Sequence, residues 1–300
     1  MARPGTARRA AAAGCRTRAG GRPGGEPGLS AQLPPPLGAP RPPPPPPPGP
    51  LPLPGPQLPP PPGEGSPAGG SALPRATWRA VEAIPVFVIA LVATTAIAAI
   101  AAAFVNDRGL LNVVAQLGFE VTVPASVILW IRGVHRTSLR TVGLGRRPLG
   151  DLGFGTVSGL VTYLGAFFAV APVVVLLWEA FSGHEPTAPE QIPTDLSGGA
   201  LVLLSVVVLV GAPVAEELFF RGFLFRALRA RRSFVVSAVV SGAAFGLVHY
   251  LNGNWILVPI MFFVGIALAW IYERRGSILA PMAAHFTFNV IGLTVILATR

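Results

Sequence analysis

The stretch 199–225, GALVLLSVVVLVGAPVAEELFFRGFLF, is a long apolar run that carries two glutamates and an arginine near its end. A helix needs about 20 predominantly apolar residues to cross the hydrocarbon core of a bilayer, and this run supplies more. No alternation of apolar and polar residues competes with a helix. Because a charged side chain is costly inside hydrocarbon, the Glu216-Glu217 and Arg221 cluster indicates a functional site.

Similar apolar runs precede and follow this stretch. The sequence therefore predicts an all-α polytopic membrane protein with about seven transmembrane helices, at 84–105, 110–131, 153–178, 199–225, 233–250, 255–272 and 278–298. An eighth span would need a half-helix within 179–198, where four acidic residues and three prolines disfavour it.

Composition agrees with a membrane protein. Only 12% of the 300 residues are charged and 51% are hydrophobic, whereas a soluble domain carries about 25% charged residues. The net charge is +10, from 23 basic and 13 acidic residues, and every basic residue is an arginine. Most arginines outside the N-terminal segment lie in every second connection between spans. This pattern predicts a multi-pass plasma-membrane protein with a cytoplasmic N-terminus and an external C-terminus, and it disfavours a nucleic-acid partner. The lone Cys15 excludes an internal disulfide framework and a cysteine-ligated zinc.

The first 74 residues differ from the rest, because 24 of the 34 prolines lie there. Such a segment cannot bury enough apolar surface to offset the entropy of ordering, so we expect a disordered cytoplasmic tail. One interpretation is an arm that contacts anionic lipid or a domain that binds proline-rich segments. The other, which we favour, is a passive extension, or a start codon assigned too far upstream. We expect two N-terminal transmembrane helices and a basic loop at 75–149, and a helical domain that carries the site at 150–300.

Few ionisable side chains interrupt the spans, and apart from Glu120 they all lie in the C-terminal third. Glu217 and Arg221 are four residues apart and share a helix face, while Glu216 points about 100° away. One glutamate can then be neutralised by the arginine while its neighbour exchanges protons. The alternative, a buried ion pair that only fixes packing, leaves Glu216 unexplained.

Two further motifs place polar groups in apolar helices. Phe245 and His249 share one face, and His285 and Asn289 share another. Each alone fits an interhelical hydrogen bond. Together with the glutamates they supply a general base, a water-orienting or metal-binding group and an oxyanion stabiliser. His249, His285 and Glu216 could also hold zinc with one open position. No organic cofactor is expected, and neither a His-Glu-x-x-His helix nor a Gly-x-Ser-x-Gly elbow occurs.

The order of these three motifs, with the lead-in Tyr272–Ser277, resembles the CPBP (CAAX protease and bacteriocin-processing, or Abi) family of intramembrane metalloproteases across about 150–298. The resemblance implies an endopeptidase that hydrolyses membrane-associated protein or peptide substrates, of the prenyl or leader-peptide type. It implies that Glu216 with His249 activates water and that His285 with Asn289 stabilises the oxyanion. Glu217, Arg221 and Phe245 would support them.

Two other functions stay open from the sequence. A non-catalytic membrane scaffold on the same fold would tolerate loss of the polar residues. A proton-coupled transporter would need Glu216 and His249 but hardly Asn289. The expected spans also contain a conflict. They place His249 near the outer end of its helix and Glu216 on the cytoplasmic side of mid-membrane, an axial offset of about 15 Å for upright helices.

Overall fold

The computed structural model describes residues 73–144, 148–186, 196, 198–250 and 255–299, and every regular element among them is helical. The all-α prediction is therefore confirmed. Six of the helices are long and apolar enough to cross a membrane. The tail expected at 1–74 lies outside the described residues except for its last two, and so does most of the segment where a half-helix is conceivable.

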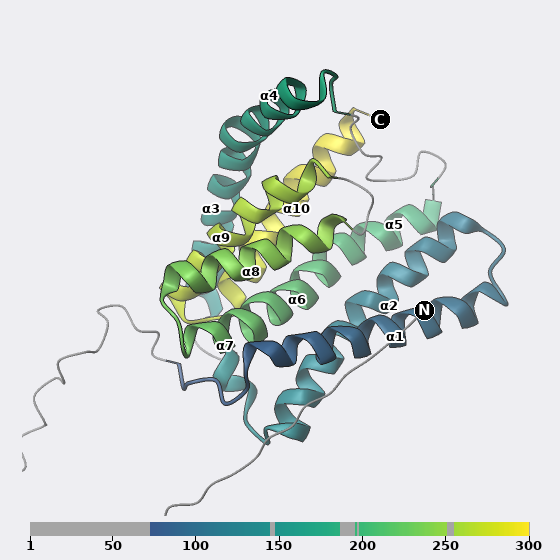
Figure 1. Ribbon diagram of the computed structural model, residues 1–300. Coiled ribbons are helices and arrows are strands. Elements are labelled where there is room, and N and C mark those ends of the chain that lie inside the picture. Colours follow the sequence, from purple (N-terminus) through teal and green to yellow (C-terminus); the bar gives the residue numbers. More distant parts are fainter. Residues whose placement is uncertain (1–72, 145–147, 187–195, 197, 251–254, 300) are drawn as a thin grey trace, which may run out of the picture. The chain divides into compact units, whose positions relative to one another are not determined.

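The helices follow the predicted apolar runs closely (Figure 1). Two of them are interrupted by π-helical turns but continue, over Pro148–Ser182 and Gly198–Arg229. The helical elements are α1 Ala83–Ala102, α2 Arg108–Leu129, α3 Pro148–Gly165, α4 Ala171–Ser182, α5 Gly198–Val206, α6 Ala212–Glu217, α7 Arg226–Arg229, α8 Phe234–His249, α9 Leu257–Arg275 and α10 Leu279–Ala298.

Helix α8 corrects one expectation about the spans. Its 16 residues extend about 24 Å, which is less than the roughly 30 Å of the hydrocarbon core. It begins at a capped terminus, where the Ser233 side chain accepts from the Val236 N–H. In its middle, the Ser241 hydroxyl donates to the Phe220 carbonyl at 3.0 Å. The run at 233–250 thus forms a short helix that is held against the site-bearing helix.

Three helix pairs organise the bundle: α1 with α2, α8 with α9, and α3 with α10. Small residues allow the last pair to approach closely, as is common in membranes. A Cβ atom on Gly159 would lie 2.3 Å from the Ala284 carbonyl oxygen and 2.8 Å from its Cα. This contact needs a glycine, because any side chain would push α10 away.

Gly159→Leu is therefore expected to destabilise the protein by about 1–3 kcal/mol, the usual cost of overpacking. Thermal unfolding of the purified chain in detergent measures this. Gly153→Leu on the same helix is the matched control, because a Cβ at Gly153 meets no atom within 4 Å. Equal unfolding midpoints for the two variants would contradict the close approach of α3 and α10.

The N-terminal helices are not separate from the rest. The Trp78 indole is fully buried, donates to the Phe223 carbonyl at 2.9 Å and stacks on the Phe223 ring at 5.2 Å. Helix α2 packs against α6. The described residues belong to one compact unit, so 75–149 and 150–299 share a core.

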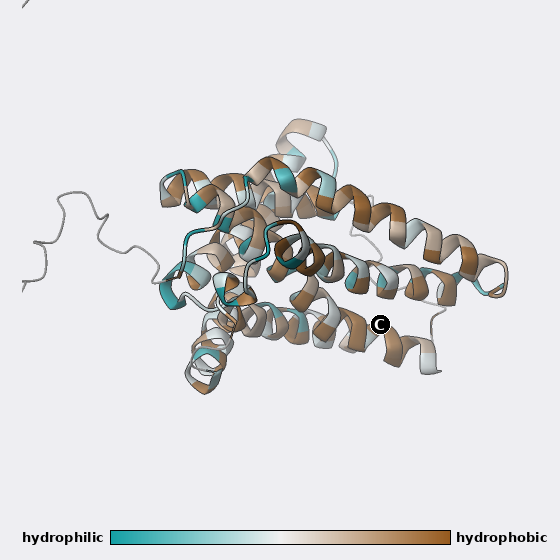
Figure 2. Ribbon diagram, turned by 90° about the horizontal axis from the view of Figure 1, so that it is seen from below, coloured by the Kyte–Doolittle hydropathy of each residue, from teal (hydrophilic) through white to brown (hydrophobic). Residues whose placement is uncertain are grey.

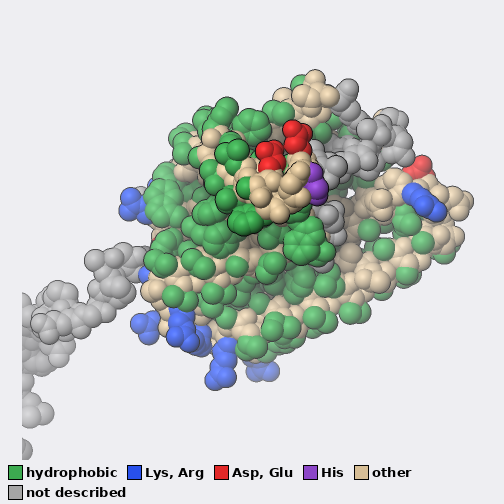
Figure 3. Space-filling model, turned by 45° about the horizontal axis from the view of Figure 1, so that its top comes forward, with side chains coloured by type: hydrophobic (Ala, Val, Ile, Leu, Met, Phe, Trp, Pro, Cys, Tyr) green, Lys and Arg blue, Asp and Glu red, His purple; other side chains and the backbone are tan. Residues whose placement is uncertain are grey.

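The outer surface is that of a multi-pass membrane protein. Large apolar side chains are exposed along the sides of the helices, and Figure 2 shows hydrophobic residues along most of their length. In Figure 3 most arginines gather toward one end of the bundle. A plasma-membrane location and a cytoplasmic N-terminus stay predictions.

Candidate active site

The helix Gly198–Arg229 carries the glutamates between two π-helical segments, Val207–Gly211 and Leu218–Phe225. Pro213 lies in the first turn of α6, directly after the first segment. Proline has no N–H to donate and crowds the preceding turn, and the wider π turn accommodates both effects. Such π segments are frequent at functional sites, and Glu216 and Glu217 lie between two of them.

Glu217 lies at the centre of a buried cluster. Its Oε1 accepts from Arg221 Nη1 at 3.0 Å, and neither side chain is exposed. The other end of the guanidinium donates to the Gly265 carbonyl at 3.1 Å, and its centre lies 4.4 Å from the centroid of the Phe245 ring. Arg221 is therefore held on three sides, and its charge balances that of Glu217.

His285 lies between the two glutamates. Its Nδ1 is 3.0 Å from Glu217 Oε1, and its Nε2 is 4.0 Å from Glu216 Oε2. A carboxylate paired with arginine can only accept hydrogen bonds, so Nδ1 must be the donor. This bond orients the imidazole and directs Nε2 toward Glu216, whose side chain is 14% exposed.

His249 does not pair with a carboxylate among the described residues. Its Nδ1 lies 2.8 Å from the Phe245 carbonyl in its own helix, which leaves Nε2 as an acceptor. Its ring packs on Phe245 at 4.8 Å, and Phe245 also contacts the His285 ring at 5.9 Å. The Phe245 ring is thus in contact with both His249 and His285.

In the structure, His249 and Glu216 lie at nearly the same height, whereas the predicted spans separate them by about 15 Å along the helix axes. Helix α7 continues to Arg229 and α8 starts at Phe234, so the two form a hairpin. Measured from that turn, Glu216 and His249 differ in height by about two residues, or about 3 Å. The contact of Arg221 with Phe245, one turn nearer the hairpin on both helices, agrees with this.

Asn289 reaches the same helix from α10. Its Nδ2 donates to the Val208 carbonyl at 2.8 Å, inside the first π segment. A side-chain amide carries two N–H groups, so one remains for another acceptor. The structure therefore brings Glu216, Glu217, Arg221 and His285 together, with Asn289 and His249 bound to neighbouring backbone.

The zinc ligands expected from the sequence do not form a group. Among the residues that the structure describes, no three His, Cys, Asp or Glu side chains are placed to hold a metal ion. His249 in particular is turned to its own backbone. Zinc binding by His249, His285 and Glu216 stays a prediction, and no step of the reaction below depends on it.

Glu120 is a carboxylate that sequence reasoning left outside the site. It is 5% exposed in the middle of α2, and its Oε1 accepts from Gln116 Nε2 at 2.5 Å. Its stem packs on the site-bearing helix, where a Cβ on Gly211 would lie 3.1 Å from it. The one sequence feature that pointed to Glu120 was its position in the middle of an apolar span. The packing of α2 on α6 was not visible from the sequence.

Comparison with known proteins places this site in a known context. Residues 198–291 match the family model described as Rce1-like, type II CAAX prenyl endopeptidase. This segment is similar to that family. It contains all three motifs, which confirms the resemblance that they indicate, whereas Glu120 lies outside it.

Two relatives extend the Rce1-like match. The chain is 25% identical over 184 residues to the "Putative membrane peptidase YdiL" of Bacillus subtilis (strain 168), an alignment that covers 61% of this chain and 70% of the relative. It is also 25% identical over 137 residues to the "Uncharacterized 24.3 kDa protein" of Escherichia coli, which covers 45% of this chain and 63% of that protein. No solved structure gives a significant match.

Proposed function

We propose that the chain is an intramembrane endopeptidase that cleaves membrane-associated protein or peptide substrates with water. The observation that carries the proposal is the His285 imidazole, with Nδ1 at 3.0 Å from Glu217 and Nε2 at 4.0 Å from Glu216. Ionisable groups inside a membrane cost free energy, so their presence there indicates a functional site. The Rce1-like match over the same residues supports a protease.

In the proposed reaction Glu216 is the general base. It accepts one proton of a water molecule, and His249 Nε2 accepts a hydrogen bond from the other. The resulting hydroxide attacks the peptide carbonyl carbon. The oxyanion accepts from the second N–H of Asn289 and from Nε2 of protonated His285, whose positive charge Glu217 stabilises. The protonated Glu216 then gives its proton to the leaving amine, which breaks the C–N bond.

The substrate class is part of the proposal. The name of the matching family refers to prenylated CAAX proteins, so we propose substrates whose scissile bond lies near a lipid-modified end. A leader peptide that enters the membrane surface is the second substrate type. Both would reach Glu216 from the bilayer rather than from water.

The test uses the full chain in vesicles with two fluorogenic peptides, a farnesylated CAAX peptide and a leader-type apolar peptide. Cleavage by the wild-type chain is expected, with loss of activity in the single alanine variants of Glu216, His249, His285 and Asn289. Full activity of Glu216→Ala would contradict the peptidase. If the wild-type chain cleaves neither peptide and all four variants still support the cellular function of the protein, the scaffold is favoured. Proton uptake that needs Glu216 but not Asn289 would favour the transporter.

Metal analysis of the same preparation tests the zinc prediction separately. One equivalent of zinc that leaves with a chelator, together with the activity, would support it. Activity that persists in metal-free protein would leave Glu216 and His249 as the water-activating groups.

A further inference from the structure

An apolar groove lies between α3 and α9, apart from the glutamate cluster. It has a volume of about 520 Å³, within the range of small-molecule sites. One wall comes from α3 and the π turn that follows it, and the other wall comes from α9. Characteristic lining residues are Val157, Val161, Gly165, Phe263, Ala267 and Trp270.

The groove offers little to a polar ligand. Ser158 and Thr162 are its only hydroxyl-bearing lining residues, and Thr162 donates to the Ser158 carbonyl at 2.8 Å. The helix Pro148–Ser182 is apolar and little buried along its length, so the groove opens sideways. In a membrane protein such an opening faces hydrocarbon, and its occupant is an apolar chain.

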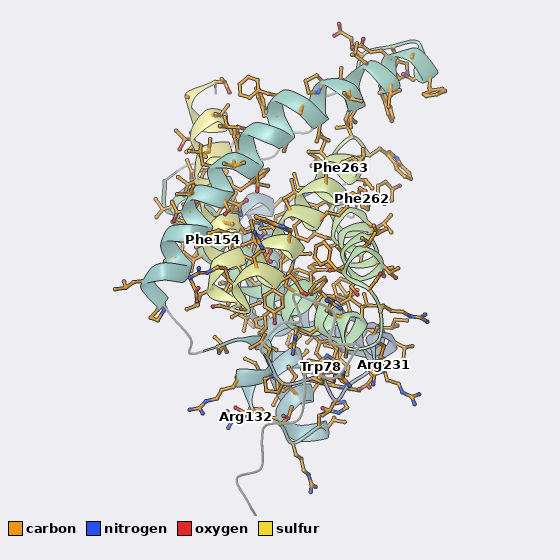
Figure 4. All side chains as sticks on the ribbon, turned by 90° about the vertical axis from the view of Figure 1, so that its left-hand side faces the viewer. Trp78, Arg132, Phe154, Arg231, Phe262 and Phe263 are labelled. Atoms are coloured by element: carbon orange, nitrogen blue, oxygen red, sulfur yellow. The ribbon has the colours of Figure 1, made fainter. Side chains whose placement is uncertain are left out.

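One end of the groove is marked by aromatic and cationic groups. The Trp270 ring lies 6.3 Å from the Phe154 ring, and the Arg274 guanidinium lies 5.4 Å from the Trp270 centroid. Arg275 lies over Phe154 at 5.3 Å and binds Asp151 at 2.8 Å. Figure 4 shows Phe154 at the end nearer to Arg132 and Arg231, with Phe263 farther away.

The charge at this end is uncompensated. Asp151 and Arg275 neutralise each other, and Glu273 pairs with Arg229 at 3.0 Å. Arg274 is exposed and makes no ion pair with any residue in the described ranges. The tryptophan ring supports one face of its planar guanidinium, which leaves the N–H edge free for a bidentate acceptor such as phosphate.

We propose that this groove binds one acyl chain of an anionic phospholipid whose phosphate is held by Arg274. The position fits, because α9 ends at Arg275 and tryptophan and arginine at a helix end lie at headgroup level. Basic pockets between transmembrane helices bind anionic headgroups. The groove holds the acyl chain, and Arg274 favours lipids with a net negative charge over neutral ones.

The test measures lipid binding by the full chain in a neutral detergent. Dioleoyl phosphatidylglycerol and dioleoyl phosphatidylcholine are titrated separately, and native mass spectrometry counts the bound lipid. Wild type is expected to bind phosphatidylglycerol at least about tenfold more tightly, because both lipids offer a phosphate to Arg274 but the choline cation of phosphatidylcholine offsets the charge of its phosphate. Arg274→Gln should abolish this preference. Arg132→Gln, which removes an exposed arginine from another helix end, is its control.

A second variant tests the groove itself. A Cβ at Gly165 meets no atom within 4 Å, so Gly165→Leu is tolerated by the fold and occupies the groove. It should weaken binding of phosphatidylglycerol about tenfold, whereas Gly153→Leu, outside the groove, should not. Unfolding midpoints without lipid check that each variant is folded.

Four results would overturn the proposal. Equal binding of both lipids by wild type would remove the charge selection. Arg274→Gln behaving as Arg132→Gln would remove the headgroup site. Unchanged binding in Gly165→Leu would place the lipid elsewhere. Dimers that disappear in Gly165→Leu would show instead that a second copy covers this face.

Discussion

Glu216→Gln is expected to lower kcat for peptide cleavage about 1,000-fold, within the range for loss of a general base. The amide has nearly the shape of the carboxylate, so the fold should persist, but it cannot accept the proton of water. KM should change little, because substrate binding does not use this proton. Initial rates in vesicles over a range of peptide concentrations separate the two constants.

Glu120→Gln is the matched control for this result. Glu120 is also a buried carboxylate on a transmembrane helix and packs against the site-bearing helix at Gly211, yet it has no part in the proposed reaction. Its variant should stay within tenfold of the wild-type kcat. If both glutamine variants lost activity to the same degree, the assignment of Glu216 as the base would be wrong.

Arg221→Met is expected to lower the free energy of unfolding by about 3–5 kcal/mol, because it leaves a buried charge uncompensated. Glu217 is fully buried, and its Oε2 has no hydrogen-bond partner among the described residues, so after the substitution only the His285 imidazole remains beside its carboxylate. Chemical denaturation in detergent measures the loss. Arg229→Met is the control, because its pair with Glu273 is partly exposed and should contribute about 1 kcal/mol or less.

The double variant Glu217→Met with Arg221→Met separates stability from activity. Replacing both members of a buried ion pair with apolar side chains is often neutral, so most of the stability should return. Activity should stay low, because His285 loses the Glu217 oxygen that orients its Nδ1. Recovery of both stability and activity would show that the pair only fixes packing.

Particular residues show how far sequence reasoning reached. The i,i+4 pairing of Glu217 with Arg221 follows from helical periodicity, and in the structure Arg221 Nη1 lies 3.0 Å from Glu217 Oε1. The hydrogen bond of His285 goes to Glu217 on another helix, a partner that helical periodicity does not predict. Likewise the partner of Asn289 is the Val208 carbonyl. Contacts between helices depend on their rotation and height, and local periodicity contains neither.

The sequence by itself determined that the chain is helical, that it crosses a membrane several times and that its costly ionisable groups lie on four of its helices. These properties depend on the length of apolar runs and on the spacing of residues along one helix. Only the tertiary structure decided that His285 lies between two glutamates, that Glu120 packs against Gly211 of the site-bearing helix, and that α3 and α9 leave a groove beneath Arg274. The physical reason is that helix packing is set by glycine contacts and π turns far apart in the chain, such as Gly159 against Ala284.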